Sequence, residues 1–504
     1  VGVQNVFQVA SAPNCNFLFL VPDQFTMQTQ YDLVKASKVK GIRNIDVLSF
    51  GRLSHRIFEE VGKPDRPLLD DTGKCLVLRK VMESCKEDIP LLAAGLRNPG
   101  FVQEVKSVIS EFMQYDLSPE DVIKLSEFSV SNRPLALKLN ELSILYAAFR
   151  DALANRFLTL EGTLELLCER MEYSELLKRS VVVFDGFTGF TPIQNRVIEK
   201  LLIYAKEVNV TLVLDHRYSP YRIDEATNLF ALTQKTVYAL QKLAIENQVK
   251  LGEDVLLQDI PVKRYAANPQ MAHLERMLFR PETMPYEGRE KNAAIEIIKA
   301  GTLMQESNLC CGRIFELIHE RGYRYRDIAI VTADMNAYEE PLKKQFAKYG
   351  IPHFIDNTKS LMQNPFVAYL RSALAIVRND FRYDDVFTFL RSGFAGFDCA
   401  MTDKLDNYVR AKGLRGFRMW KKPFVHPSEE LRNREEELEA LEQMRVALTE
   451  KFDSAIRLAA QEVQTAEEWC RILYEFCLRE NAGEKLRTIA DRFSRENDFV
   501  RAKE

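Results

Sequence analysis

Short, largely apolar runs recur along the first half of the chain, and each ends in polar, turn-forming residues. They lie at residues 17–21, 45–50, 181–184 and 208–214. Runs of this length predict strands that are buried on both faces of a parallel sheet. Helical periodicity separates the runs, so the pattern predicts an α/β fold with right-handed crossovers.

A long helical block interrupts this alternation. Between about residues 68 and 178 the apolar positions recur every three or four residues, as in Val102, Val105 and Ile109. An insertion of this size in a parallel sheet usually forms a subdomain.

A second α/β unit follows a stretch without periodicity. Residues 250–292 contain four prolines and are predicted to form a linker. Beyond them, strands are predicted at residues 295–298, 327–331 and 350–355, with helices between them. From about residue 382 the pattern is helical.

Composition narrows the class of protein only slightly. The chain has 504 residues, with 69 Lys and Arg against 72 Asp and Glu, so its net charge of −3 neither requires nor excludes nucleic acid. Nine cysteines without a CxxC pair argue against a disulfide framework or a zinc knuckle. There is no signal peptide and no apolar run of about 18 residues, so we expect a cytoplasmic protein without a membrane segment.

We expect the chain to be part of a longer protein. It starts with Val1 rather than Met, and it stops in a charged helical stretch at residues 492–504.

Asp185 ends the most apolar of the predicted strands, and a glycine-containing turn follows at once. Open α/β sheets bind ligands at the carboxyl ends of their strands. In a nucleotide-driven motor, an acid at this place holds Mg²⁺ and a neighbouring glutamate positions the attacking water. Gly186 stands at the glutamate position, so the metal-type acid is present and the catalytic one is not. An ordinary core strand that ends in a capping aspartate gives the same pattern.

Two other predicted strand ends carry side chains that suit single-stranded nucleic acid. Gln24 and Thr26 offer uncharged hydrogen-bonding groups to bases or ribose phosphate. Phe50 offers a ring for stacking, and Arg52 and His55 share a helix face beside it and offer cations for phosphate. The alternatives are a polar helix start, a phenylalanine that caps the core and an arginine paired with nearby glutamates.

Gly73 and Lys74 have only a superficial likeness to a phosphate loop. That motif requires a glycine at position 68 and Ser or Thr at position 75, where this chain has Leu68 and Cys75. Residues 72–83 are predicted to form a capped amphipathic helix instead.

Four strings, in order along the chain, resemble the B subunit of the AddAB (RexAB) helicase–nuclease. They are FLVPDQFT at residues 19–26, SFGRL at 49–53, DGFTGFTP at 185–192 and GYRYRDIAI at 322–330. The resemblance covers nearly the whole chain, and it implies that the chain is the N-terminal part of such a protein.

The resemblance implies two RecA-like, superfamily 1 helicase-like domains with large helical insertions. The first domain would comprise residues 1–67 and 179–250, the first insertion 68–178, the linker 251–292, an incomplete second domain 293–381 and the second insertion 382–504.

The family's function is implied in the same way. Such proteins resect double-strand DNA breaks for recombinational repair in the bacterial cytoplasm, as heterodimers with an AddA-type helicase–nuclease subunit that act on single-stranded and double-stranded DNA ends. The parent protein would use ATP and Mg²⁺. An iron–sulfur cluster and a nuclease domain would belong to its C-terminal half, outside this chain.

The resemblance also assigns residues. Gln24, Thr26, Phe50, Arg52, His55 and Phe187 would contact the threaded DNA strand. Active relatives have a phosphate loop, a glutamate at position 186 and a nucleotide-contacting arginine at position 333, where this chain has Ala333. Without these groups, nothing stabilises the negative charge on the phosphate in the transition state of ATP hydrolysis. We therefore expect no meaningful ATP hydrolysis. There are two alternatives. The chain is an active ATPase that lacks its phosphate loop by truncation, or it is a scaffold for the partner subunit.

Overall fold

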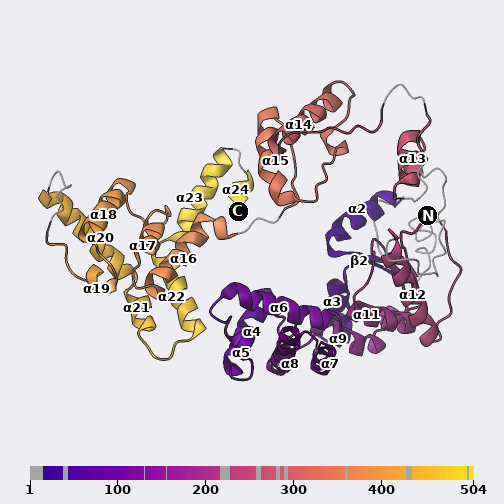
Figure 1. The fold of residues 1–504 in the computed structure, drawn as a ribbon, viewed down its shortest axis with the longest axis horizontal. Helices are drawn as coiled ribbons and strands as arrows, with labels where there is room; N and C mark the ends of the chain where they lie inside the picture. Colours follow the sequence, from indigo (N-terminus) through magenta and orange to yellow (C-terminus); the bar gives the residue numbers. More distant parts are fainter. Residues whose placement is uncertain are drawn as a thin grey trace. The chain divides into compact units, whose positions relative to one another are not determined.

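The computed structural model describes residues 15–37, 44–129, 131–154, 156–215, 228–256, 263–279, 284–288, 293–357, 361–426, 434–496 and 499–503. The chain divides into two compact units, Val1–Ile297 and Ile298–Glu504 (Figure 1).

A parallel sheet with the strand order β2-β1-β3-β4 organises the first unit. Leu20 at the end of β1 is in register with Leu48 of β2 and Phe184 of β3, so the carboxyl ends of these strands are level. The four predicted strands are confirmed, although the second and the last are shorter than predicted. The strands are β1 (Asn16–Leu20), β2 (Ile45–Leu48), β3 (Ser180–Phe184) and β4 (Glu207–Val210).

Helices cover both faces of the sheet, which explains why its central strands are apolar throughout. Leu18 and Leu20 of β1 share a core with helices α3 (Phe50–Val61), α9 (Leu160–Arg170) and α11 (Pro192–Tyr204). On the opposite face, Phe17 and Phe19 pack with Leu33 of helix α2 (Thr26–Ala36). Successive residues of a strand point to opposite faces, so two apolar cores require an unbroken apolar run.

The helical block predicted between β2 and β3 is confirmed and has a core of its own. Its two ends lie together, because the N–H of Leu69 donates to the carbonyl of Leu158 (2.7 Å) and the N–H of Leu158 to that of Pro67 (2.9 Å). The helices of the block are α4 (Asp71–Ser84), α5 (Pro90–Ala93), α6 (Pro99–Gln114), α7 (Pro119–Phe128) and α8 (Arg133–Leu153), and α9 and α10 (Glu175–Lys178) lead back to β3.

Gly73 and Lys74 belong to the first turn of α4, whose N-cap Asp70 accepts a hydrogen bond from the N–H of Gly73 at 2.7 Å. The Lys74 Nζ lies 2.9 and 3.1 Å from the two carboxylate oxygens of Glu161 on α9. Both side chains are only 6% exposed. This lysine is therefore a buried structural link, in agreement with the rejection of a phosphate loop.

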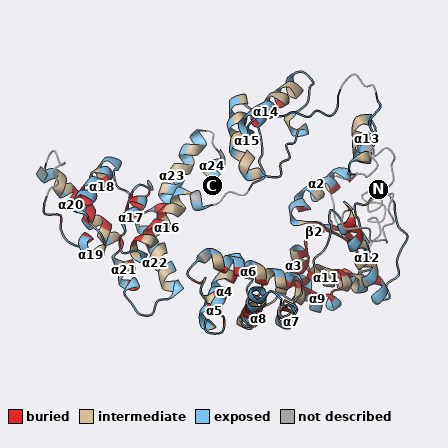
Figure 2. Cartoon of the chain, viewed as in Figure 1, coloured by how far each residue is buried: buried red, intermediate tan, exposed pale blue. Residues whose placement is uncertain are grey.

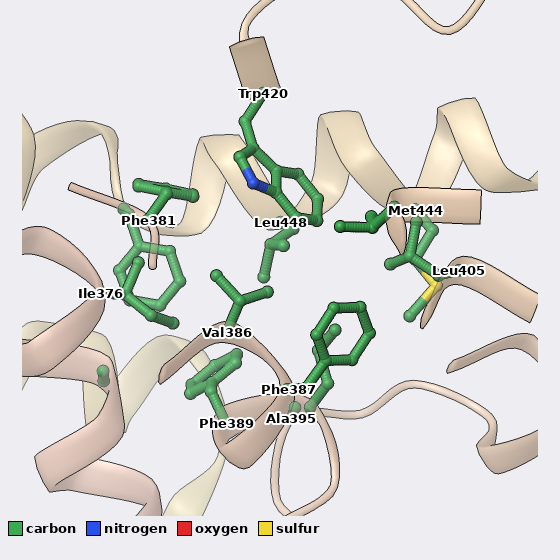
Figure 3. Close-up of a cluster of buried hydrophobic side chains, with 14 of the residues drawn as sticks. Ile376, Phe381, Val386, Phe387, Phe389, Ala395, Leu405, Trp420, Met444 and Leu448 are labelled. Atoms are coloured by element: carbon green, nitrogen blue, oxygen red, sulfur yellow. The ribbon is translucent and has the colours of Figure 1, made fainter. Parts of the chain in front are cut away.

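The second unit is helical among its described residues. Helices α14 (Leu303–His319) and α15 (Met335–Tyr349) share one small core. The later helices surround an aromatic core in which Phe381, Phe389 and Trp420 are almost fully buried (Figures 2 and 3). These helices are α16 (Pro365–Arg378), α17 (Tyr383–Leu390), α18 (Cys399–Lys412), α19 (Phe417–Trp420), α20 (Arg434–Lys451), α21 (Asp453–Ala459), α22 (Ala466–Arg479), α23 (Ala482–Arg495) and α24 (Phe499–Lys503).

The three strands predicted at residues 295–298, 327–331 and 350–355 are wrong, because the structure has no strand within residues 293–357. Ile297, Val331 and Phe354 are exposed by 95%, 93% and 88%. An apolar run becomes a strand only when a neighbouring strand pairs with its backbone, and none of the three has such a neighbour within these residues. The α/β class with large helical insertions is confirmed by the first unit.

The first unit also contains α12 (Ala231–Glu246) and α13 (Pro269–Met277), and five short 3₁₀ helices lie along the described chain. These are η1 (Asp23–Phe25), η2 (Met171–Tyr173), η3 (Lys263–Tyr265), η4 (Tyr325–Asp327) and η5 (Leu361–Gln363). Among the described helices, none combines the length and the apolar character that crossing a membrane requires.

Candidate nucleic-acid interface

The predicted DNA-contacting residues follow the carboxyl ends of three adjacent strands. Gln24 lies in η1 after β1, Arg52 and His55 lie on the first turns of α3 after β2, and Phe187 lies in the loop between β3 and α11. Because the strands are parallel and level, these residues lie along one edge of the sheet. Gln24, Arg52 and His55 are exposed, and Phe187 is half-buried.

Phe50 is part of an aromatic cluster formed by Phe50, Phe184, Phe187 and Phe190. The ring centroids of Phe50 and Phe187 are 5.8 Å apart and those of Phe187 and Phe190 are 5.0 Å apart. The side chain of Phe50 is only 7% exposed, so it caps the core, which is the alternative that the sequence left open. The half-buried rings of Phe187 and Phe190 form the accessible part of the cluster.

Thr26 is also buried, with 4% of the residue exposed. Its hydroxyl donates to the carbonyl of Asp23 at 3.0 Å, across the junction of η1 and α2. In this conformation the Thr26 side chain supports the start of a helix and is not available to a base.

Arg52 is exposed and forms no ion pair with any residue that the structure describes. The glutamates proposed as alternative partners do not hold it. The Glu60 carboxylate accepts hydrogen bonds from the Ser174 hydroxyl (2.6 Å) and the Leu176 N–H (3.0 Å) instead. The next arginine on the same helix, Arg56, lies 3.5 Å from Asp46. Arg52 is therefore free to contact a phosphate.

Asp185 is exposed at the end of β3, where its carboxylate accepts a hydrogen bond from the Thr211 hydroxyl. Gly186 has φ +77°, a conformation that side-chain-bearing residues rarely adopt, and a Cβ there would lie 3.6 Å from Pro22. Among the described residues, no group of three or more His, Cys, Asp or Glu side chains is placed to hold a metal.

A cavity of about 490 Å³ lies next to the aromatic cluster. Three elements that are distant in sequence form it: the end of α6, the loop from β3 into α11, and one face of α12. The residues that matter chemically are Tyr115, Thr188, Phe190, Asn195, Lys235 and Thr236. Sequence reasoning missed this cavity, although the helix start at Thr191–Pro192 falls within the string at residues 185–192.

Comparison with known proteins places these features in a family. The family model described as "ADDB, N-terminal" matches residues 6–275. The chain belongs to this family. The resemblance noted in the sequence is thereby confirmed, and the match to the ADDB family spans the whole sheet, its carboxyl edge and the cavity.

Curated relatives are each named as the B subunit of an "ATP-dependent helicase/deoxyribonuclease". The one from Lachnoclostridium phytofermentans is 35% identical over 501 residues, covering 98% of this chain and 43% of that protein. The one from Thermoanaerobacter sp. is 33% identical over 488 residues (96% and 42%), and the one from Acetivibrio thermocellus 30% over 505 residues (99% and 44%). This ADDB-family chain spans less than half the length of the curated relatives it matches.

Proposed function

We propose that this chain is the helicase-like, DNA-binding portion of the B subunit of an ATP-dependent helicase/deoxyribonuclease, and that it guides a single DNA strand without hydrolysing ATP itself. The observation that carries the proposal is the sheet edge where exposed Gln24, Arg52 and His55 lie in line with half-buried Phe187. The printed names of the relatives supply the kind of protein.

The edge offers the chemistry that a single strand requires. Arg52 provides a cation for a phosphate, Phe187 and His55 provide rings, and the Gln24 amide can both donate to and accept from a base edge. A DNA strand that passes over the ends of β2, β1 and β3, in the order of the sheet, would meet these groups in turn.

The proposed lack of hydrolysis is supported by the turn after Asp185. Gly186 has a backbone that disfavours the glutamate that a motor would need, and the Asp185 carboxylate is already hydrogen-bonded to Thr211. In the whole protein, ATP and Mg²⁺ would act together with an AddA-type partner subunit. The iron–sulfur cluster and the nuclease would belong to sequence beyond this chain.

Arg52→Ala tests the proposal in a fluorescence anisotropy assay with single-stranded DNA at several salt concentrations. If Arg52 contacts one phosphate, its loss weakens binding and lowers the slope of log affinity against log salt by about 0.7. Arg179→Ala is the matched control, because Arg179 is also exposed but precedes β3, at the opposite edge of the sheet.

Equal binding by Arg52→Ala and wild type would contradict the proposal and favour a scaffold for the partner subunit. Phe50→Ala is unsuitable as a test, because removing a buried aromatic ring costs about 3–5 kcal/mol of stability by itself.

A further inference from the structure

We infer that the cavity between α6, the β3–α11 loop and α12 holds one nucleotide of a single DNA strand, turned away from its neighbours. The inference rests on the proposed function, and it assigns a binding pocket next to the edge already described. The juxtaposition that carries it is an exposed tyrosine, a lysine and a helix amino terminus around one cavity.

The size and construction of the cavity fit a nucleotide. Its volume of about 490 Å³ lies within the range of about 300–1,000 Å³ that is usual for small-ligand sites. Fixed contacts hold its walls. The Thr236 hydroxyl on α12 lies 3.0 Å from the carbonyl of Leu232 in the same helix and 3.3 Å from that of Thr188, so its proton is shared between the two. Arg196 on α11 pairs with Asp116, next to Tyr115, at 2.8 Å.

The charge around the cavity favours an anion. None of the described residues that line it is acidic, and Lys235 is exposed without an ion pair to any described residue. Helix α11 begins at the cavity, with Thr191 as its N-cap. A capping box occupies the N–H groups of Thr191 and Gln194, and Pro192 has none, so the helix start contributes mainly the positive end of its dipole to the field of Lys235. A phosphate group is the anion that suits a lysine beside a helix amino terminus.

The other lining groups suit a base. Tyr115 is 55% exposed and lines the cavity, so its ring is available for stacking. The Asn195 amide can donate to and accept from a base edge. A free inorganic phosphate would leave the tyrosine and the amide without a role, so the set as a whole points to a nucleotide.

Phe190 connects the cavity with the proposed DNA path. It lines the cavity, and its ring lies 5.0 Å from that of Phe187 in the aromatic cluster. A strand that runs along the edge past Phe187 therefore brings a neighbouring nucleotide to the mouth of the cavity. Taking one base out of the stack costs little in a strand that is already single.

The experiment measures binding of a single-stranded oligonucleotide that carries 2-aminopurine at one position, by anisotropy and by 2-aminopurine emission. Tyr115→Ala should weaken binding by between about 5-fold and about 100-fold, whereas Tyr115→Phe, which keeps the ring, should bind as wild type. Both changes are at an exposed residue, so the fold is retained. The wild-type protein should also change the 2-aminopurine emission when the 2-aminopurine is at the nucleotide that enters the cavity, and Tyr115→Ala should not.

Lys235→Ala should lower the salt slope by about 0.7, since one phosphate contact is lost. Lys242→Ala is the matched control: it removes a lysine two turns along the same helix that is 3.7 Å from Glu246 and does not line the cavity. Equal losses in both lysine variants would overturn the inference, because they would reflect total charge.

Two further outcomes distinguish a failure of the cavity assignment from a failure of the proposed function. If Arg52→Ala weakens binding but Tyr115→Ala and Lys235→Ala do not, the cavity assignment fails and the proposed function stands. If all three bind as wild type, both fail. Deoxyadenosine monophosphate serves as the free-nucleotide probe: if it binds through Tyr115 while the DNA affinity is insensitive to Tyr115→Ala, the source is a free nucleotide and the DNA assignment is overturned.

Discussion

The buried ion pair between Lys74 and Glu161 makes a strong prediction about stability. It joins α4 of the helical block to α9, which packs on the sheet, and both side chains are 6% exposed. Lys74→Met removes the cation and leaves the Glu161 carboxylate buried without its partner. Breaking such a pair costs about 3–5 kcal/mol, because the remaining charge is neither solvated nor neutralised.

Lys74→Met together with Glu161→Leu should recover most of that loss. Replacing both members of a buried pair by apolar residues of similar size is often neutral or stabilising, because no desolvated charge remains. The residual loss should come from Asp71, which lies 3.8 Å from Lys74 but is 75% exposed and therefore well solvated.

Urea unfolding followed by two probes measures the effect. Far-ultraviolet circular dichroism reports on both units, whereas both tryptophans, Trp420 and Trp469, lie in the second unit. Lys74→Met should lower the dichroism midpoint of the first unit by on the order of 1 M urea or more. The tryptophan fluorescence transition should stay in place.

Three results would refute the reasoning: a single variant as stable as wild type, a double variant no more stable than the single one, or an equal shift of the tryptophan transition. The last would show that the loss is not confined to the unit that contains the pair.

Two further predictions concern β3 and its neighbours. Gly186→Glu introduces the glutamate expected in an active motor. It should cost about 1–2 kcal/mol of unfolding free energy because of the positive φ, and it should produce no DNA-stimulated ATP hydrolysis. Gly252→Glu is the control, because Gly252 is exposed and has open space around it. Burial raises the pKa of the Cys168 thiol from 9.0 to about 11, so the unfolded chain loses this proton at lower pH than the folded one. The contribution of the protonated thiol to the unfolding free energy is complete below pH 9 and is lost as the pH rises to about 11. In wild type the unfolding free energy should therefore fall by on the order of 2 kcal/mol more across this window than in Cys168→Ala. An equal fall in both proteins would contradict the assignment.

The sheet was predictable because its sequence signal is local and unambiguous. Residues 17–21 and 181–184 are apolar at every position, and only a strand covered on both faces requires this. The helical block was predictable for a similar reason, since its periodicity continues through several helices with clear caps such as Ser118.

The strands predicted at residues 295–298, 327–331 and 350–355 show why an apolar run alone does not establish a strand. Their apolar runs look like those of the sheet, but a strand also needs a hydrogen-bonded neighbour, and sequence pattern carries no information about which segment that is. The same run can therefore be a buried strand in one context and an exposed, irregular segment in another.

The candidate site was predictable in its location and not in its exposure. Strand ends of a parallel sheet must gather at one edge, so the approach of Phe50 to Phe187 follows from the topology. Whether Phe50 and Thr26 face solvent depends on neighbours such as Phe184 and Phe190, which the local sequence does not specify. The cavity was missed because Tyr115 and Lys235 become neighbours only after three elements have packed together.

The backbone hydrogen bonds between Pro67, Leu69 and Leu158 bring the two ends of the helical block to the same point beside the sheet. Because its two ends are adjacent, the block can differ in length between relatives without altering the spacing of β1, β2 and β3, provided that the helix carrying Lys74 is kept against Glu161. Tyr115 belongs to this helical block, whereas Phe187 follows a strand of the sheet. Sequence changes in the block during evolution could therefore alter one wall of the cavity and leave the edge of the sheet unchanged.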